Sequence, residues 1–171
     1  MFNTIRNVTI IPCGLGDKRA ELRLSIPIKP SGSVGYGLSH IVSKSANMMP
    51  ERRANWKYIE ETIRISTIDE IVETKKIDRV DFIKADIEGW ELRMLTGAKK
   101  TLMRDHPSLM IEVADAYLSR AGDSTNELFD YLTGFGYRAF QLDPGLLHFE
   151  EITHPEDSDV FFTTSENINF T

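Results

Sequence analysis

The feature that most constrains this chain is the alternation of apolar strand segments with a helical segment in its middle. Val80–Asp86 and Leu109–Val113 are short apolar runs typical of buried strands. An apolar stripe at helical spacing lies between them and predicts one helix over residues 90–104. The members of this stripe are Leu92, Leu95, Ala98 and Leu102. A strand–helix–strand order of this kind predicts an α/β fold with a parallel sheet covered by helices.

The remaining elements are predicted from local patterns. Thr67 followed by Glu70 three residues later is a capping-box signature, so a short helix is expected to begin there. A second helix is expected over 126–133, with Gly134 near its C-terminus. Alternating or β-branched runs predict further strands at 7–12, 20–26, 61–66, 137–142 and 159–164. The segment 29–58 contains several prolines and glycines and is predicted to be a long loop or a lid over a substrate.

Composition narrows the class of protein. The chain has 171 residues, of which 41% are hydrophobic, and this is the size of a single domain over residues 1–171. A formal net charge of −6 lacks the basic footprint of a nucleic-acid binder. The single cysteine, Cys13, excludes an internal disulfide, and no apolar run is long enough to span a bilayer. Without a signal-peptide pattern at the start, the expected location is the cytoplasm.

The stretch Lys84–Glu91 carries the chemistry that is easiest to read. It leaves a strand and enters a helix, and ligands of α/β sheets bind beyond the carboxyl ends of the strands. Asp86 and Glu88 are two residues apart and point to the same side of an extended backbone, so they are candidate catalytic residues. A structural role is also open, since acids stabilise a helix N-terminus, and for Glu91 that role is favoured. For Lys84, an ion pair with a neighbouring acid is an alternative to a functional role.

Two other places are candidates for a site. Glu112 interrupts an apolar strand, and a buried carboxylate without a partner is costly. It therefore either has a partner or reaches the active edge of the sheet. Gly14-Leu15-Gly16 follows a predicted strand, but Arg19 stands where a dinucleotide fingerprint needs its third small residue. A phosphate cradle is rejected, and Gly14 and Leu15 remain candidates for a tight turn beside a cofactor.

Several stretches of the chain together resemble the FkbM family of S-adenosylmethionine-dependent methyltransferases. The most specific is Asp81-Phe82-Ile83-Lys84-Ala85-Asp86-Ile87-Glu88-Gly89-Trp90-Glu91. The supporting stretches are Thr67-Ile68-Asp69-Glu70-Ile71, Leu95-Thr96-Gly97-Ala98 and Pro107-Ser108-Leu109-Met110-Ile111-Glu112. Residues 7–26 and Gly134-Phe135-Gly136-Tyr137 are similar to further parts of the family pattern.

The resemblance implies a class I methyltransferase fold, which is Rossmann-like with a mostly parallel sheet and helices on both faces. It implies S-adenosylmethionine as cofactor and, as acceptor, a small molecule with a hydroxyl group, such as a sugar or a polyketide-like product. Asp86 and Glu88 would lie beside the methyl donor or the acceptor, with Asp86 as the base or the acceptor-orienting group. No resident metal is expected, although a cation that bridges the two acids is a lesser alternative.

The family's glycine-rich turn and ribose-binding acid should precede the strand predicted at 7–12. The chain is therefore expected to be an N-terminally truncated FkbM-type domain that lacks the first βαβ unit. Two alternatives stay open: a non-catalytic α/β remnant that serves as an interaction module and self-associates through an open sheet edge, and an acid-rich metal-binding domain.

Overall fold

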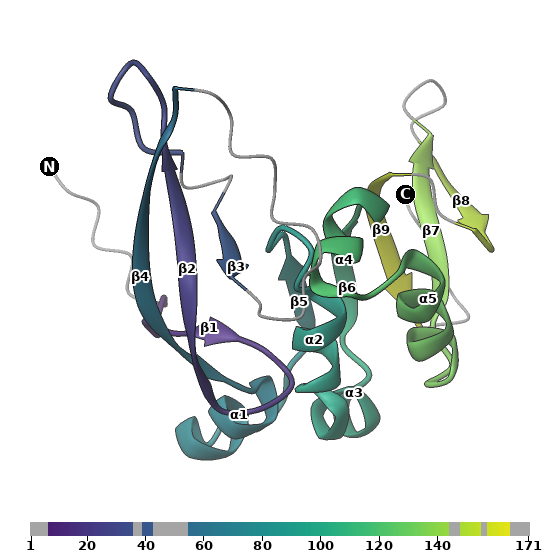
Figure 1. The fold of residues 1–171 in the computed structure, drawn as a ribbon. Coiled ribbons are helices and arrows are strands. Elements are labelled where there is room, and N and C mark those ends of the chain that lie inside the picture. The colour runs from purple at the N-terminus through teal and green to yellow at the C-terminus, as the bar shows by residue number, and fades with distance from the viewer. Residues whose placement is uncertain (1–6, 36–38, 43–54, 144–147, 155–156, 165–171) are drawn as a thin grey trace, which may run out of the picture.

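The computed structural model describes residues 7–35, 39–42, 55–143, 148–154 and 157–164, which form two sheets and five helices (Figure 1). The helices are α1 (Ile68–Lys75), α2 (Glu91–Thr96), α3 (Lys99–Asp105), α4 (Asp115–Ala121) and α5 (Thr125–Thr133). The strands are β1 (Gly14–Leu15), β2 (Ala20–Ile28), β3 (His40–Val42), β4 (Lys57–Ser66), β5 (Phe82–Ala85), β6 (Ser108–Val113), β7 (Arg138–Asp143), β8 (His148–Ile152) and β9 (Ser158–Thr163).

The first sheet is built on a long antiparallel pair. β2 and β4 run side by side from the pair Ala20 and Ile65 to the pair Ile28 and Lys57, within the order β1-β4-β2-β3. The strands predicted at 20–26 and 61–66 are thus confirmed, and both are longer than predicted. β1 is the exception to the antiparallel pattern, because it lies parallel to the end of β4.

The second sheet has the order β5-β6-β9-β7-β8, and only its β5–β6 pair is parallel. β9 returns between β6 and β7 and is antiparallel to both. The mixed α/β class is confirmed, but the expectation of a mostly parallel sheet is wrong. Helices also separate β4 from β5 and β6 from β7 along the chain. The other pairs of this sheet are antiparallel because β9 inserts between β6 and β7 and because β8 forms a hairpin with β7.

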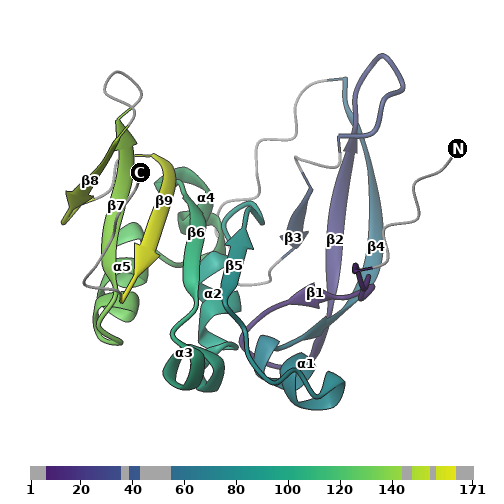
Figure 2. The ribbon, with the colours of Figure 1, turned by 180° about the vertical axis from the view of Figure 1, so that it is seen from behind.

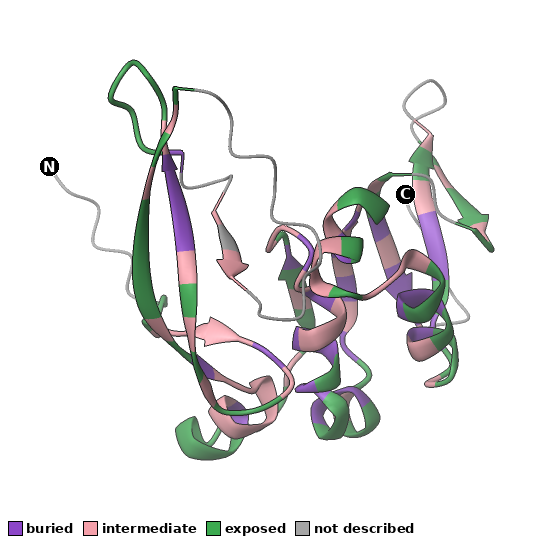
Figure 3. Cartoon of the chain, viewed as in Figure 1, coloured by how far each residue is buried: buried purple, intermediate pink, exposed green. Residues whose placement is uncertain are grey.

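Helices α2, α4 and α5 lie over one face of the second sheet (Figure 1), and the view from behind shows the strands on the opposite face without a described helix in front of them (Figure 2). The expectation of helices on both faces is therefore not met in the described part of the chain. Burial concentrates between these helices and the sheet (Figure 3). Alternation in β6 directs Leu109, Ile111 and Val113, all fully buried, into this core.

Residues 7–12, predicted to be a buried strand, belong to neither sheet. The side chains of Val8 and Ile10 are 59% and 86% exposed. Their β-branched pattern is typical of a strand, but among the described residues no strand pairs with it, so pattern alone gave the wrong prediction. The short strand β1 begins only at Gly14.

The helix predicted over 90–104 is two helices, which meet at Gly97 and Ala98. A Cβ at Gly97 would lie 2.0 Å from the carbonyl oxygen of Gly16, the residue that follows β1. Position 97 therefore has room only for glycine. Asp69 in α1 then caps the second helix: its carboxylate accepts hydrogen bonds from the amides of Lys100 and Thr101, both at 2.9 Å, and from the Thr101 hydroxyl at 2.7 Å.

Asp69→Ala is expected to lower the free energy of unfolding by about 2 kcal/mol, because three donors at the start of α3 lose their acceptor. Asp130→Ala is the control, since Asp130 is exposed on α5. Urea denaturation of both variants measures the difference. Equal midpoints for the two variants would show that Asp69 does not tie α1 to α3.

The segment predicted to be a loop or lid is described only in part. Of the segment 29–58, residues 36–38 and 43–54 lie outside the described residues, and the described part includes β3 and the start of β4. Its role as a lid stays a prediction.

The helix predicted to begin after Thr67 is confirmed, since the Glu70 amide donates to the Thr67 hydroxyl oxygen at 3.0 Å. In the described ranges, no helix is long and apolar enough to cross a membrane.

Candidate active site

The loop that follows β5 has a backbone shape that few sequences can adopt. Glu88 and Gly89 both have positive φ, at 57° and 98°. A Cβ at Gly89 would lie 2.1 Å from the carbonyl oxygen of Tyr117, so α4 packs directly against this glycine. The Glu-Gly pair therefore turns the chain sharply from the strand into α2 and leaves no room for a side chain at the second position.

The carboxylate of Glu91 binds the backbone of this loop. Its side chain is almost entirely buried, with 1% of the residue exposed, and its Oε1 accepts hydrogen bonds from the amides of Ile87 (3.0 Å) and Gly89 (3.2 Å). Burial raises the pKa of Glu91. The structural role favoured from the sequence is the one that these contacts support: Glu91 is a positioning residue for the loop of Asp86 and Glu88.

The structure brings Asp86, Glu88 and Glu112 into one electrostatic cluster. Ala85, the last residue of β5, pairs in register with Ile111 of β6, so the residues that follow, Asp86 after β5 and Glu112 near the end of β6, are neighbours across the two strands. Burial raises the pKa of Glu112 to about 7, and the nearby carboxylate of Asp86 contributes to this shift. Burial and Asp86 also raise the pKa of Glu88.

The members of this cluster differ in exposure. The Asp86 side chain is 55% exposed and forms an ion pair with Lys84 at 3.5 Å, which is the alternative anticipated for Lys84. Glu112 is only partly exposed, and its Oε2 atom is buried without a described hydrogen-bond partner. Among the residues that the structure describes, no group of three His, Cys, Asp or Glu side chains is arranged to hold a metal ion.

A hollow of about 370 Å³ opens beside Glu112. Its polar lining comes from Tyr117 on α4, from Ser158 and Asp159 on β9, and from Asp157 just before that strand. Sequence reasoning missed these residues. Asp159 lies directly opposite Glu112 in the β6–β9 register, and only the antiparallel return of β9, which the sequence did not predict, brings the two acids together.

The turn Gly14-Leu15-Gly16 lies close to Trp90, the residue just before α2. A Cβ at Gly16 would lie 3.1 Å from Trp90 Nε1, and Leu15 packs against the core of the five-stranded sheet. Trp90 Nε1 is itself buried without a described hydrogen-bond partner. Gly14 packs against Ile65 of β4, because a Cβ added at Gly14 would lie only 2.6 Å from Ile65 Cδ1. The turn is thus close to the loop after β5, and its two candidate cofactor contacts stay predictions.

An α/β chain with acids at the ends of two adjacent parallel strands, beside a hollow, has the layout of an enzyme that binds its ligands at the carboxyl edge of a sheet. Comparison with known families gives the class: the family model of the methyltransferase FkbM domain matches residues 3–139. The chain belongs to the FkbM methyltransferase family, as its motifs indicated. No curated protein and no solved structure matches it.

Proposed function

We propose that this chain takes part in S-adenosylmethionine-dependent methyl transfer to a hydroxyl oxygen of a small-molecule acceptor, such as a sugar or a polyketide-like product. Family membership supports methyl transfer as the reaction. The observation that carries the assignment of residues is the proximity of Asp86 to Glu112, which lines a hollow and whose pKa is raised to about 7. A carboxylate that titrates near neutral pH is suited to accept a proton from a hydroxyl group.

Several residues at this edge fit the cofactor. The buried Nε1 of Trp90 is a donor that has no described partner, and the acids Asp86 and Glu88 complement a positively charged sulfonium. Gly14 and Leu15, in the turn beside Trp90, would form part of the same wall. When bound, the cofactor supplies an activated methyl group for an in-line displacement.

The protein's contribution is then orientation and proton transfer. Glu91 fixes the loop, Asp86 orients the acceptor hydroxyl, and Glu112 takes its proton while Glu88 adds negative charge beside them. Holding the reacting groups in line is the larger effect, because it replaces an encounter in solution by a bound geometry.

Calorimetric titration tests the cofactor assignment. The wild-type chain is expected to give a saturable isotherm with S-adenosylmethionine, and Asp86→Asn is expected to weaken binding about tenfold, because a charge facing the cofactor is lost. Asp81→Asn is the matched control, since Asp81 is 77% exposed and pairs with Arg79. A flat wild-type isotherm at millimolar cofactor would contradict the proposal.

The non-catalytic interaction module is the second candidate, and the free edge of β5 favours it. Within the described sheet, β5 pairs only with β6, and Phe82 on this edge strand is 52% exposed. This reading predicts self-association, visible as a concentration-dependent sedimentation coefficient, which Phe82→Lys reduces. An unchanged monomer at all concentrations would remove this candidate.

A further inference from the structure

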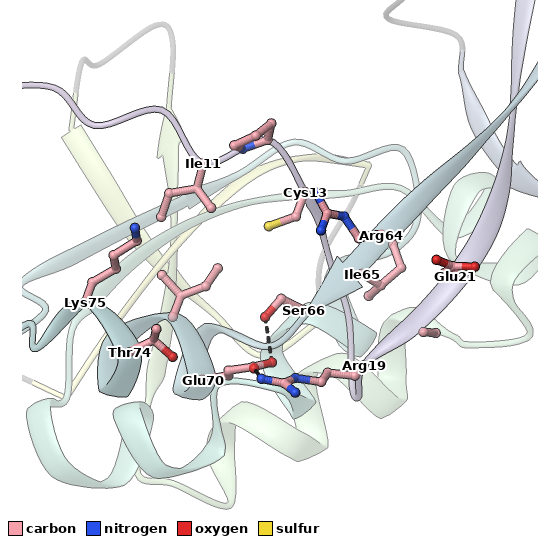
Figure 4. Close-up of a pocket in the computed structure, with 13 residues that line it drawn as sticks. Ile11, Cys13, Arg19, Glu21, Arg64, Ile65, Ser66, Glu70, Thr74 and Lys75 are labelled. Carbon is pink, nitrogen blue, oxygen red and sulfur yellow. Dashed lines mark hydrogen bonds and ion pairs between the residues drawn. The ribbon is translucent and has the colours of Figure 1, made fainter.

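One cavity lies away from the acids of the candidate active site. It has a volume of about 690 Å³ and is bounded by the ends of β2 and β4, by α1 and by residues 11–13 (Figure 4). Cavities of 300–1,000 Å³ are the usual size for small-molecule sites. Asp86, Glu88 and Glu112 do not contribute to its lining, so the cavity is separate from the acids of the candidate active site.

The inner wall of the cavity is apolar, with a few polar atoms directed into it. Ile11, Ile65 and Ile71 provide aliphatic surface from three different parts of the chain. Figure 4 shows the sulfur of Cys13 and the hydroxyl of Ser66 facing the same space. An apolar surface with a small number of convergent polar groups is the usual composition of a site for an organic molecule.

The charges around the cavity leave an excess of positive groups. Glu70 is already engaged, because it forms an ion pair with Arg19 and accepts a hydrogen bond from Ser66 at 2.8 Å. Arg64 and Lys75 also line the cavity, and neither side chain has a hydrogen bond or an ion pair with a described residue.

Glu21 is the other acid of the lining, and it is the cross-strand neighbour of Arg64. Figure 4 shows the guanidinium of Arg64 beside Cys13 instead, on the side away from the Glu21 carboxylate. Lys75 lies across the opening, near Ile11. The two cations therefore give the mouth of an apolar cavity a positive potential without a described counter-ion.

We propose that this cavity binds a small organic anion, whose apolar body packs on Ile11, Ile65 and Ile71 and whose carboxylate or sulfonate pairs with Arg64. Lys75 adds to the attraction from the opposite rim. Arginine is suited to this role because its planar fork donates two parallel hydrogen bonds to such groups. The site is separate from the proposed methyl-transfer site, and its occupancy does not depend on that function.

Two matched fluorescent probes test the site. 8-Anilinonaphthalene-1-sulfonate and N-phenyl-1-naphthylamine share one apolar body, and only the first carries an anionic group. The sulfonate probe is expected to bind about tenfold more tightly than the neutral probe. Cys13, the only cysteine of the chain, reports the location: saturating sulfonate probe is expected to slow its alkylation by iodoacetamide several-fold. Equal affinities, or an unchanged alkylation rate, would overturn the proposal.

A pair of double variants isolates the charges. R64Q/K75Q is expected to weaken the sulfonate probe about tenfold and to leave the neutral probe unchanged. K57Q/K99Q removes the same net charge at exposed positions outside the cavity and is expected to change neither probe. Equal losses in both variants would attribute binding to net charge and would contradict a site. S-adenosylmethionine affinity, measured in parallel, is expected to be the same in R64Q/K75Q as in the wild type, so the two proposals fail or hold separately.

Discussion

Gly89→Ala is expected to lower the free energy of unfolding by about 3–5 kcal/mol and the melting temperature by about 10 °C. A new Cβ would lie 2.1 Å from the carbonyl oxygen of Tyr117, which belongs to the backbone of α4 and cannot rotate away. The positive φ of 98° adds the strain that any L-residue has there. Thermal unfolding followed by circular dichroism measures the loss.

Gly122→Ala separates the two causes. Gly122 has a φ of +84°, but an added Cβ would have no atom within 4 Å. This variant therefore carries the backbone strain without the steric overlap, and about 1 kcal/mol of destabilisation is expected. Should the two variants melt at the same temperature, the packing of α4 on Gly89 would not be what fixes the loop after β5.

Glu112→Gln is expected to reduce methyl transfer about 100-fold and to stabilise the protein at alkaline pH. The loss follows because an amide cannot accept the proton that we assign to Glu112. The gain follows because burial raises the pKa of Glu112 to about 7, so the folded chain holds an unfavourable charge once that group ionises.

The sign of the pH effect follows from this shift. Below about pH 4.5, Glu112 is protonated in both folded and unfolded chains, and the substitution changes little. As the pH rises toward about 7, the unfolded chain ionises first, and the wild type loses stability. Because Glu112 is partly exposed, we expect a gain for Glu112→Gln of about 1–2 kcal/mol at pH 8.

Urea midpoints at pH 4.5 and pH 8, together with a radiolabelled methyl-transfer assay, check both effects. Glu150→Gln is the control, since Glu150 is an exposed acid on β8. Full activity of Glu112→Gln would show that Glu112 does not accept the proton. The same difference in urea midpoint between variant and wild type at both pH values would show that the pKa of Glu112 is not raised in the folded chain.

The parts of the fold that the sequence predicted are those that local patterns determine. The helix start capped by Thr67, the strand around Ile83 and the strand at Leu109–Val113 depend on neighbours in sequence, and all are present. For Glu112 the sequence left two alternatives open, a partner or a place at the active edge of the sheet, and the structure puts Asp86 close enough to contribute to its raised pKa.

The errors have a common cause, which is that long-range pairing is not visible in a local pattern. Val8 and Ile10 have the composition of a buried strand, yet no described strand accepts them. The break at Gly97 depends on the carbonyl of Gly16, 81 positions earlier, and the acidic pair of Glu112 and Asp159 depends on the return of β9. No spacing of residues around any of these positions contains that information.

The contact between Gly16 and Gly97, with Asp69 bound to the start of α3, has a consequence for cooperativity. It fastens the long hairpin sheet to the helices of the other sheet through backbone atoms and a carboxylate. If either sheet moves away at this junction, the hydrogen bonds from the amides of Lys100 and Thr101 to Asp69 must break. The amides of Lys100 and Thr101 should therefore exchange with deuterium only when both sheets open together, in a single all-or-none transition.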